Sequence, residues 1–167
     1  MSSEKNQNIP LKDVKGLDVI TVPDQFELRE SNIKGAGIGV FAKTNIGART
    51  HLGVYKGVYI PIEEFNKFSQ EDKAKGFEYG WEIHDFRGNK NRPRGYKLKD
   101  QHIIGYIDAK DPTKSNYLRY INHPVTADQE NVVPYQLEDK IHYMTNKDIK
   151  AGEELFVNYG EQYFHTS

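Results

Sequence analysis

The stretch NYLRYINHP, residues 116–124, poses the main question of this sequence. The pair Asn122-His123 follows an apolar run that carries two tyrosines and an arginine, and Pro124 ends the run. Such a pair is compatible with a metal corner, with half of an acid/base device, or with a turn that ends a short helix. Taken alone, it favours the turn, because proline cannot continue a helix.

The composition indicates one globular domain. The chain has 167 residues, which is enough for a proper core but not for two large ones. Its net charge of −1 argues against a surface built wholly for nucleic acid or membrane. No apolar run approaches the roughly 20 residues that span a bilayer, and the polar N-terminus lacks the apolar segment of a secretory signal. We therefore expect a soluble intracellular protein that is not secreted.

The absence of cysteine limits the possible chemistry. Disulfides, thiolate nucleophiles and cysteine-based zinc modules are excluded. None of the six histidines falls in an HExxH arrangement, which would place two metal ligands on one helical face. We expect no metal site. The eleven tyrosines are unusual, yet a tyrosine-rich small domain is often a β-protein with half-buried rings.

Short β-type runs separated by glycine turns make up most of the chain. Strands are expected in residues 26–29 and 40–42, joined by a tight turn, in 51–60 (a pair, with Gly53 and Gly57 marking turns or bulges), and in 79–85 and 102–109. Residues 132–138 and 140–146 are expected to form a hairpin, and residues 150–160 a turn that leads into a last strand. One helix is expected at 61–76, with Pro61 at its first position and acidic residues in its first turn. Its apolar residues recur every three positions and predict one buried stripe. Residues 1–24 are polar and aperiodic, which predicts an N-terminal arm.

Several weak motifs become specific when they are taken in order. Gly37-Ile38-Gly39 alone is a weak signal, and no GxGxxG phosphate loop opens a helix. The full succession is Gly37-Ile38-Gly39, Tyr106-Ile107-Asp108-Ala109, Arg119-Tyr120-Ile121-Asn122-His123, Gly152-Glu153-Glu154-Leu155 and Asn158-Tyr159-Gly160. This order resembles the SET domain of protein lysine methyltransferases over about residues 26–164. The segments HLGVYKG, SNYLRYIN, ENVVPYQ and LFVNYGEQY resemble most closely the PR/SET (PRDM-type) branch.

The resemblance implies a fold and a boundary. The fold is mostly β, with small antiparallel sheets, few short helices and a pseudoknot-like threading of the C-terminal segment. Residues 25–165 would form a single SET domain behind the arm of residues 1–24. In this family the segment that matches Asn122-His123 lies where the chain threads beneath a neighbouring loop. The pair is therefore expected to form a cofactor corner, meaning a bend of the chain that contacts the cofactor.

The resemblance also implies an activity, which is methyl transfer from S-adenosyl-L-methionine to a lysine, most plausibly on a histone tail. The implied cofactor-binding residues are Ala36, Gly37, Ile38, Tyr79, Asn122, His123 and Tyr163. The implied catalytic tyrosine is Tyr159, and Tyr55 and Tyr143 would line the lysine channel. A histone substrate would place the protein in the nucleus or on chromatin, and another substrate would leave it cytoplasmic.

Plainer interpretations stay open. Each tyrosine, taken alone, is more typical of a strand or core residue, and Asp108 is more typical of a structural acceptor than of a base. The basic loop Arg87–Lys99 is typical of a solvated loop, or of a surface that contacts nucleosomal DNA. Two other functions are a PR-like binding module for peptide or protein partners without turnover, and a β-rich nucleic-acid-binding domain.

Overall fold

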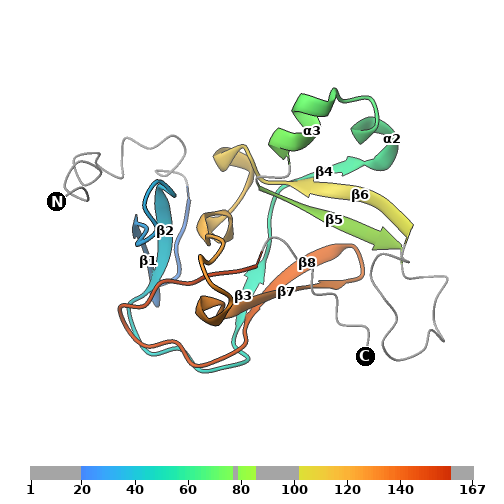
Figure 1. The fold of residues 1–167 in the computed structure, drawn as a ribbon. Coiled ribbons are helices and arrows are strands. Elements are labelled where there is room, and N and C mark those ends of the chain that lie inside the picture. The colour runs from blue at the N-terminus through green and yellow to red at the C-terminus, as the bar shows by residue number, and fades with distance from the viewer. Residues whose placement is uncertain (1–19, 77–78, 86–101, 159–167) are drawn as a thin grey trace.

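The computed structural model describes residues 20–76, 79–85 and 102–158, which fold into three small antiparallel sheets. The first is a hairpin of β1 (Phe26–Glu30) and β2 (Ile38–Ala42). The second has the order β3-β8-β7, built from His51–Val54, Lys140–Thr145 and Val132–Leu137. The third has the order β4-β6-β5, built from Val58–Pro61, His102–Asp108 and Gly80–Asp85. Figure 1 shows the hairpin set apart from the two three-stranded sheets.

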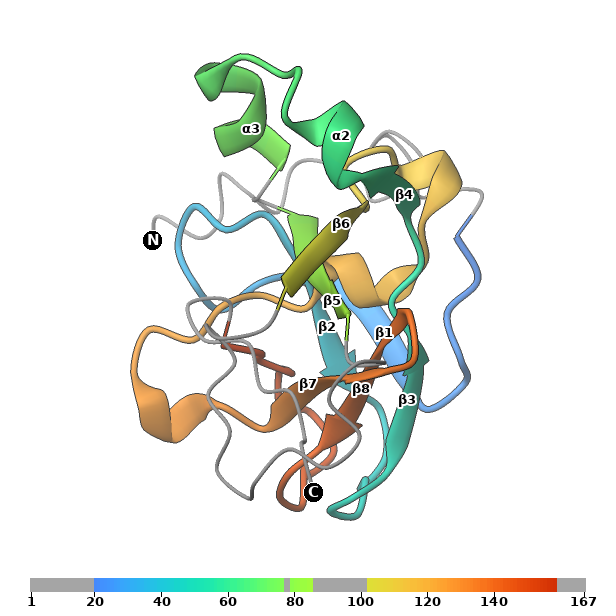
Figure 2. The same ribbon diagram turned by 90° about the vertical axis from the view of Figure 1, so that its right-hand side faces the viewer.

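The helices are few and short, which confirms the predicted mostly-β fold. They are α2 (Ile62–Phe65), α3 (Gln70–Gly76), and the 3₁₀ turns η5 (Pro112–Lys114), η6 (Tyr117–Tyr120) and η7 (Ala127–Gln129). Figures 1 and 2 both place α2 and α3 together at one end of the molecule, beyond β4 and β6. The turn η6 packs against β2 and so joins the hairpin to the rest of the fold.

The single helix predicted for residues 61–76 is wrong, because the segment forms two helices. Pro61 ends strand β4 and is the N-cap of α2, rather than the first residue inside a helix. The second helix has its own start signal, since the Ser69 hydroxyl accepts a hydrogen bond from the Asp72 backbone N–H at 3.1 Å. Serine at such a position satisfies a backbone donor that the first turn of a helix leaves unpaired. This start signal divides the segment.

The strand pair predicted for residues 51–60 exists as two strands that do not pair with each other. Strand β3 pairs with β8, and β4 pairs with β6, so the segment passes from one sheet to another. The register of β3 shifts between His51 and Gly53, where Gly53 has a φ of 139°. Of the turn or bulge expected at that glycine, the register shift fits the bulge. The predicted hairpin of β7 and β8 also forms, with Glu138 in the left-handed region at a φ of 56°.

The C-terminal segment 154–157 is threaded between other parts of the chain instead of forming the regular last strand expected there. It makes isolated bridges to Phe41, Asn122 and Val132. The backbone N–H of Leu155 donates to Val40 at 2.8 Å, and that of Val157 donates to Asn122 at 2.9 Å. All four residues of the segment are buried. Because each neighbouring segment makes only one bridge with it, segment 154–157 forms no continuous ladder. The threading predicted from the family resemblance is present.

The core contains residues of all three sheets. Its largest fully buried side chains are Trp81, Tyr143, Phe41, Ile83, Leu118, Ile121, Ile141, Ile149 and Leu155. Burial of such apolar surface is the main driving force for folding. Among the described residues, no helix is long and apolar enough to cross a bilayer.

Candidate active site

The glycine-rich turn between β1 and β2 brings backbone groups to the surface. The Ser31 backbone N–H donates to the Gly37 carbonyl at 2.8 Å and closes the turn. Gly37 has a φ of 79°, which favours glycine, and a Cβ there would meet no atom within 4 Å. The backbone of Gly37 is therefore open to a ligand. Ala36 and Ile38, on either side, are half-buried.

Glu154 ties this turn to the Asn-His pair. Its carboxylate is 3% exposed and accepts hydrogen bonds from the Ser31 hydroxyl at 2.6 Å and the Asn32 backbone N–H at 2.8 Å. The Asn122 amide nitrogen lies 3.3 Å from the same carboxylate and 3.1 Å from the Ile38 carbonyl. A buried charge is tolerated when donors surround it. We call Ser31, Gly39, Asn122 and Glu154 the polar corner.

Gly39 is the glycine of this region at which a larger residue would find no space for its side chain. A Cβ there would collide with the Glu154 carboxylate and lie 3.3 Å from the Asn122 amide nitrogen. Sequence reasoning gave no role to Gly39 or Glu154 beyond membership of a motif. The signal that was present is the acidic pair of GEEL, of which Glu153 is exposed and Glu154 is buried.

Asn122-His123 follows a short helix, as the pair taken alone indicates, since η6 ends at the C-cap Ile121. The pair also contributes to a tertiary site. The Asn122 side chain is half-buried in the polar corner and its backbone carbonyl accepts from Val157, whereas His123 is exposed. The turn and the cofactor corner are therefore compatible interpretations of one geometry.

The two predicted channel tyrosines lie against each other around a tryptophan. The rings of Tyr55 and Tyr143 are 5.3 Å apart, and both meet Trp81 edge to face. The Trp81 indole N–H donates to the Tyr143 hydroxyl at 2.8 Å. All three side chains are at most 3% exposed. We call Tyr55, Trp81 and Tyr143 the aromatic cluster.

Tyr79 contacts both the aromatic cluster and Arg119, which lies three residues before Asn122 of the polar corner. Its backbone carbonyl accepts a hydrogen bond from the Tyr55 hydroxyl at 3.0 Å. The guanidinium of buried Arg119 lies 4.2 Å from the Tyr79 ring centre, a cation–π contact. The Arg119 Nε donates to the Ala109 carbonyl at 2.7 Å, which holds the guanidinium in place. Because Arg119 precedes Asn122 by three residues, η6 links both halves of the predicted site.

Two hollows lie near these elements. The larger one is open, has a volume of about 550 Å³, and is lined by Val54, Tyr55, Lys56, Gly57, Tyr59, Ile107, Asn116, Asp139 and Lys140. It therefore reaches the aromatic cluster through Tyr55.

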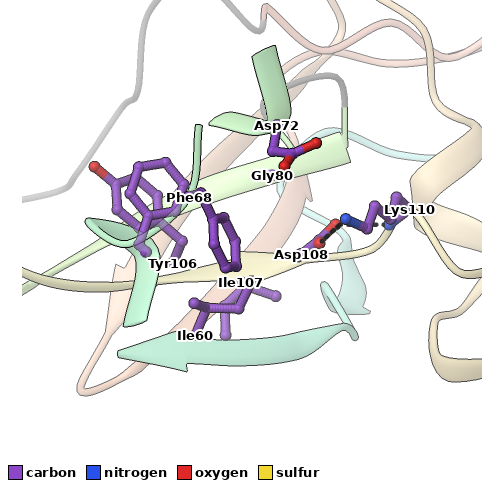
Figure 3. Close-up of a pocket in the computed structure, with 9 residues that line it drawn as sticks. Ile60, Phe68, Asp72, Gly80, Tyr106, Ile107, Asp108 and Lys110 are labelled. Carbon is purple, nitrogen blue, oxygen red and sulfur yellow. Dashed lines mark hydrogen bonds and ion pairs between the residues drawn. The ribbon is translucent and has the colours of Figure 1, made fainter. Parts of the chain in front are cut away.

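The smaller hollow lies beneath α2 and α3 and is shown in Figure 3. Its volume of about 10 Å³ suits one water molecule at most. The rings of Phe65 and Tyr106 stack at 3.9 Å in its wall, and burial, more than the nearby Glu82 carboxylate, raises the pKa of Tyr106. Asp108 accepts from the Lys110 backbone N–H at 2.9 Å, so it is a structural acceptor here.

The remaining predicted site residues lie outside the described ranges. They are Tyr159, Tyr163 and the basic loop Arg87–Lys99. Within the described ranges, no three histidine, aspartate or glutamate side chains converge as metal ligands would.

Comparison with known proteins places the chain in a family. The model of the PR domain of PR domain zinc finger protein 2 matches residues 26–167. The mouse protein named histone-lysine N-methyltransferase MECOM is 35% identical over 140 residues, which are 84% of this chain and 9% of that protein. The chain thus spans about a tenth of the length of this curated relative.

Solved structures agree with this assignment. The SET domain of the RIZ1 tumor suppressor (PRDM2) superposes with a TM-score of 0.61 at 25% identity, over 92% of this chain and 80% of that one. A ctPRC2 structure in an autoinhibited conformation bound to S-adenosylmethionine gives a TM-score of 0.57 at 28% identity, over 85% of this chain and 16% of that one. The chain is therefore a member of the PR-domain branch of the SET-domain methyltransferase family.

Proposed function

We propose that this domain is an S-adenosyl-L-methionine-dependent protein-lysine N-methyltransferase that acts on a histone tail. The observation that carries the proposal is the linkage of the aromatic cluster to the polar corner through Tyr79 and Arg119. A methyltransferase must hold a methyl donor and a lysine close together, and such positioning alone can supply much of the rate. The names of the relatives and the family assignment support this reaction class.

The polar corner and the glycine turn fit the cofactor. The open space at Gly37 allows a ligand to approach the backbone directly. The Asn122 amide N–H groups are directed at Ile38 and Glu154, which fixes the plane of the side chain. We infer that Ala36, Gly37, Ile38, Tyr79, Asn122, His123 and Tyr163 hold S-adenosylmethionine. When bound, the cofactor would supply an activated methyl group on a sulfonium. Transfer of this methyl group needs no metal ion.

The aromatic cluster would receive the lysine. A lysine amine has a reference pKa near ~10.4 and must lose its proton before it can accept a methyl group. Tyr55 and Tyr143 are buried, and a narrow dry channel beside a positive sulfonium lowers the pKa of an amine. Tyr159 would orient that amine. The open hollow beside Tyr55 is large enough for the approaching peptide segment.

A histone substrate implies a location in the nucleus or on chromatin, and the basic loop Arg87–Lys99 would contact nucleosomal DNA there. Because the chain covers a small part of its curated relative, these partners are proposals for the domain alone.

The test is transfer of a radiolabelled methyl group from S-adenosylmethionine to core histones without added divalent ions. The matched substrate control is a histone panel with lysine-to-arginine tails. Label on wild-type tails and its loss on one altered tail supports the proposal. Cofactor binding by calorimetry without transfer to any tested protein would instead favour a PR-like binding module. Absence of cofactor binding would contradict both the methyltransferase and the PR-like binding module, and would favour a nucleic-acid-binding domain.

A further inference from the structure

Strand β8 carries a histidine and a methionine on the face of its sheet that is turned away from the core. Successive side chains of a strand point to opposite faces, so His142 and Met144 share one face while Tyr143 between them points to the other. Tyr143 is fully buried, whereas His142 and Met144 are half-buried. Two residue types that bind soft metal ions therefore lie side by side outside the proposed methyl-transfer site.

The neighbouring strand β3 adds a second histidine to this face. His51 is the register partner of Met144, and opposite residues of antiparallel strands have Cβ atoms about 4.5–5.5 Å apart. The Nε2 atom of His51 lies 2.9 Å from the Nδ1 atom of His142, and the two ring centres are 5.1 Å apart. The two nitrogens therefore face each other across the gap between the rings. Figure 2 shows β3 and β8 lying side by side.

The bulge in β3 shapes this arrangement. Because the register shifts between His51 and Gly53, Val54 rather than Gly53 lies opposite His142. A bulge bends its strand and increases the local twist, and such bulges are frequent where a side chain is re-aimed. His51 is exposed, and exposed side chains change rotamer rapidly, so its ring can turn toward a ligand.

We propose that His51, His142 and Met144 bind one copper(I) ion on the outer face of β3 and β8. Two imidazoles and a thioether suit copper(I), whereas magnesium and calcium take oxygen ligands. Two nitrogens that each bind one metal ion at about 2 Å lie about 3–4 Å apart, depending on the angle between them. The histidine pair therefore needs to open only slightly from its 2.9 Å separation.

The surroundings of His142 favour a neutral imidazole and an ion of low charge. Burial first, then the charges of His51 and Lys140, lowers the pKa of His142, and a metal-binding nitrogen must be unprotonated. Lys140 is two residues away on the same strand, and its ammonium repels a monovalent ion less than a divalent one. The ring of Tyr135 stacks on that of His142 and supports it from the side of β7.

The test is a competition for copper(I) between the whole chain and the coloured chelator bicinchoninate, with ascorbate and without oxygen. We expect the wild-type protein to take one equivalent of copper from the chelator. His51→Asn and His142→Asn should each lower the affinity by more than about 100-fold, since even groups that only orient a metal ligand contribute about 10- to 100-fold. His123→Asn removes an exposed histidine outside β3 and β8, and this control should bind copper as wild type does.

The outcome of this competition is clear in either direction. Equal affinity in wild type, His51→Asn and His142→Asn would overturn the inference, because copper would then bind elsewhere. Circular dichroism establishes that each variant is folded, and His51→Asn changes an exposed side chain, so it keeps the test valid if His142→Asn loses its fold. The inference is independent of the proposed function, since no methyl transfer is measured.

A second readout follows the sulfur ligand directly. The chain has two methionines, Met1 and Met144, so isotope labelling of methionine methyl groups gives two resonances, and Met144→Leu identifies the second. Copper(I) should shift the Met144 resonance in wild type and leave it in place in His142→Asn. Met144→Leu should lower the copper affinity about tenfold or more. Zinc or copper binding with an unmoved Met144 resonance would overturn the three-ligand copper site.

Discussion

The polar corner and the aromatic cluster, the two parts of the proposed site, are held together by different forces. In the polar corner, a buried carboxylate gathers donors from Ser31, Asn32 and Asn122. In the aromatic cluster, three large rings pack against one another and share one side-chain hydrogen bond. Removing the carboxylate of the polar corner takes one acceptor from three donors, whereas removing one tyrosine hydroxyl of the aromatic cluster keeps the ring packing and affects one donor.

From this difference we expect different roles for the two regions. The polar corner fixes backbone positions in the glycine turn and is suited to cofactor binding. The aromatic cluster fixes hydroxyl directions and is suited to controlling the transfer. Changes in the first region should therefore appear in stability and cofactor affinity. Changes in the second should appear in rate and product.

The largest effect on stability is expected for Glu154→Ala. This change removes the acceptor of three hydrogen bonds and leaves their donors without it. The free energy of unfolding should fall by about 3 kcal/mol, since an orphaned buried donor costs about 1–3 kcal/mol and one buried and two partly buried donors lose this acceptor. Urea denaturation measures the change. The neighbouring exposed residue supplies the control, Glu153→Ala, and equal stability of the two variants would contradict the role given to the polar corner.

Tyr159→Phe should give the largest effect on rate. If the resemblance assigns this residue correctly, loss of one preorganised hydroxyl should slow methyl transfer by about 10²-fold. The fold and the cofactor affinity should hardly change, because the ring is kept. Single-turnover methylation at saturating S-adenosylmethionine measures the rate. A wild-type rate in this variant would make Tyr159 a strand residue and favour the binding-module alternative.

A smaller effect on stability is expected from His142, which precedes Tyr143 in strand β8. A ring nitrogen of His142 lies 2.9 Å from a ring nitrogen of His51, and the ring of Tyr135 stacks on that of His142. Burial first, then the charges of His51 and Lys140, lowers the pKa of His142 below its ordinary value of 6.5. The unfolded chain therefore binds this proton more readily, and stability should fall as the pH drops through 6.5 toward the lowered folded-state pKa.

The measurement is urea denaturation across this pH window in wild type and His142→Asn. The variant should show a shallower dependence of stability on pH. An identical dependence in both proteins would show that His142 is not the group responsible. Cofactor affinity should be insensitive to this change, because His142 belongs to neither region.

The sequence predicts the strands better than it predicts the contacts between segments that are distant in the chain. Strand alternation and glycine turns are local signals, so both hairpins were predicted correctly. The single helix predicted at residues 61–76 is wrong, because a serine in the middle of the segment is a weaker local signal than Pro61, and its role as a cap depends on its contact with the Asp72 N–H. The segment 154–157 looks like a strand, but its irregular bridging depends on distant partners, which no local pattern reveals.

The site shows the same limit. The family resemblance named Tyr55, Tyr143 and Tyr79, and the structure brings the three together. The sequence predicts no role for the side chains of Trp81 and Glu154, because their importance comes from the residues they contact. A tryptophan in a strand and a glutamate in an acidic pair look ordinary until the partner strand and the glycine turn are in place.

The division between the two regions is tested most directly by titrating S-adenosylmethionine calorimetrically into Asn122→Ala and Tyr143→Phe side by side. Asn122→Ala should weaken binding by about 1–3 kcal/mol, or roughly 5- to 150-fold, because a partly buried polar contact is lost. Tyr143→Phe should bind the cofactor as tightly as wild type. Equal affinities in both variants, or a loss confined to Tyr143→Phe, would contradict the assignment of cofactor binding to the polar corner.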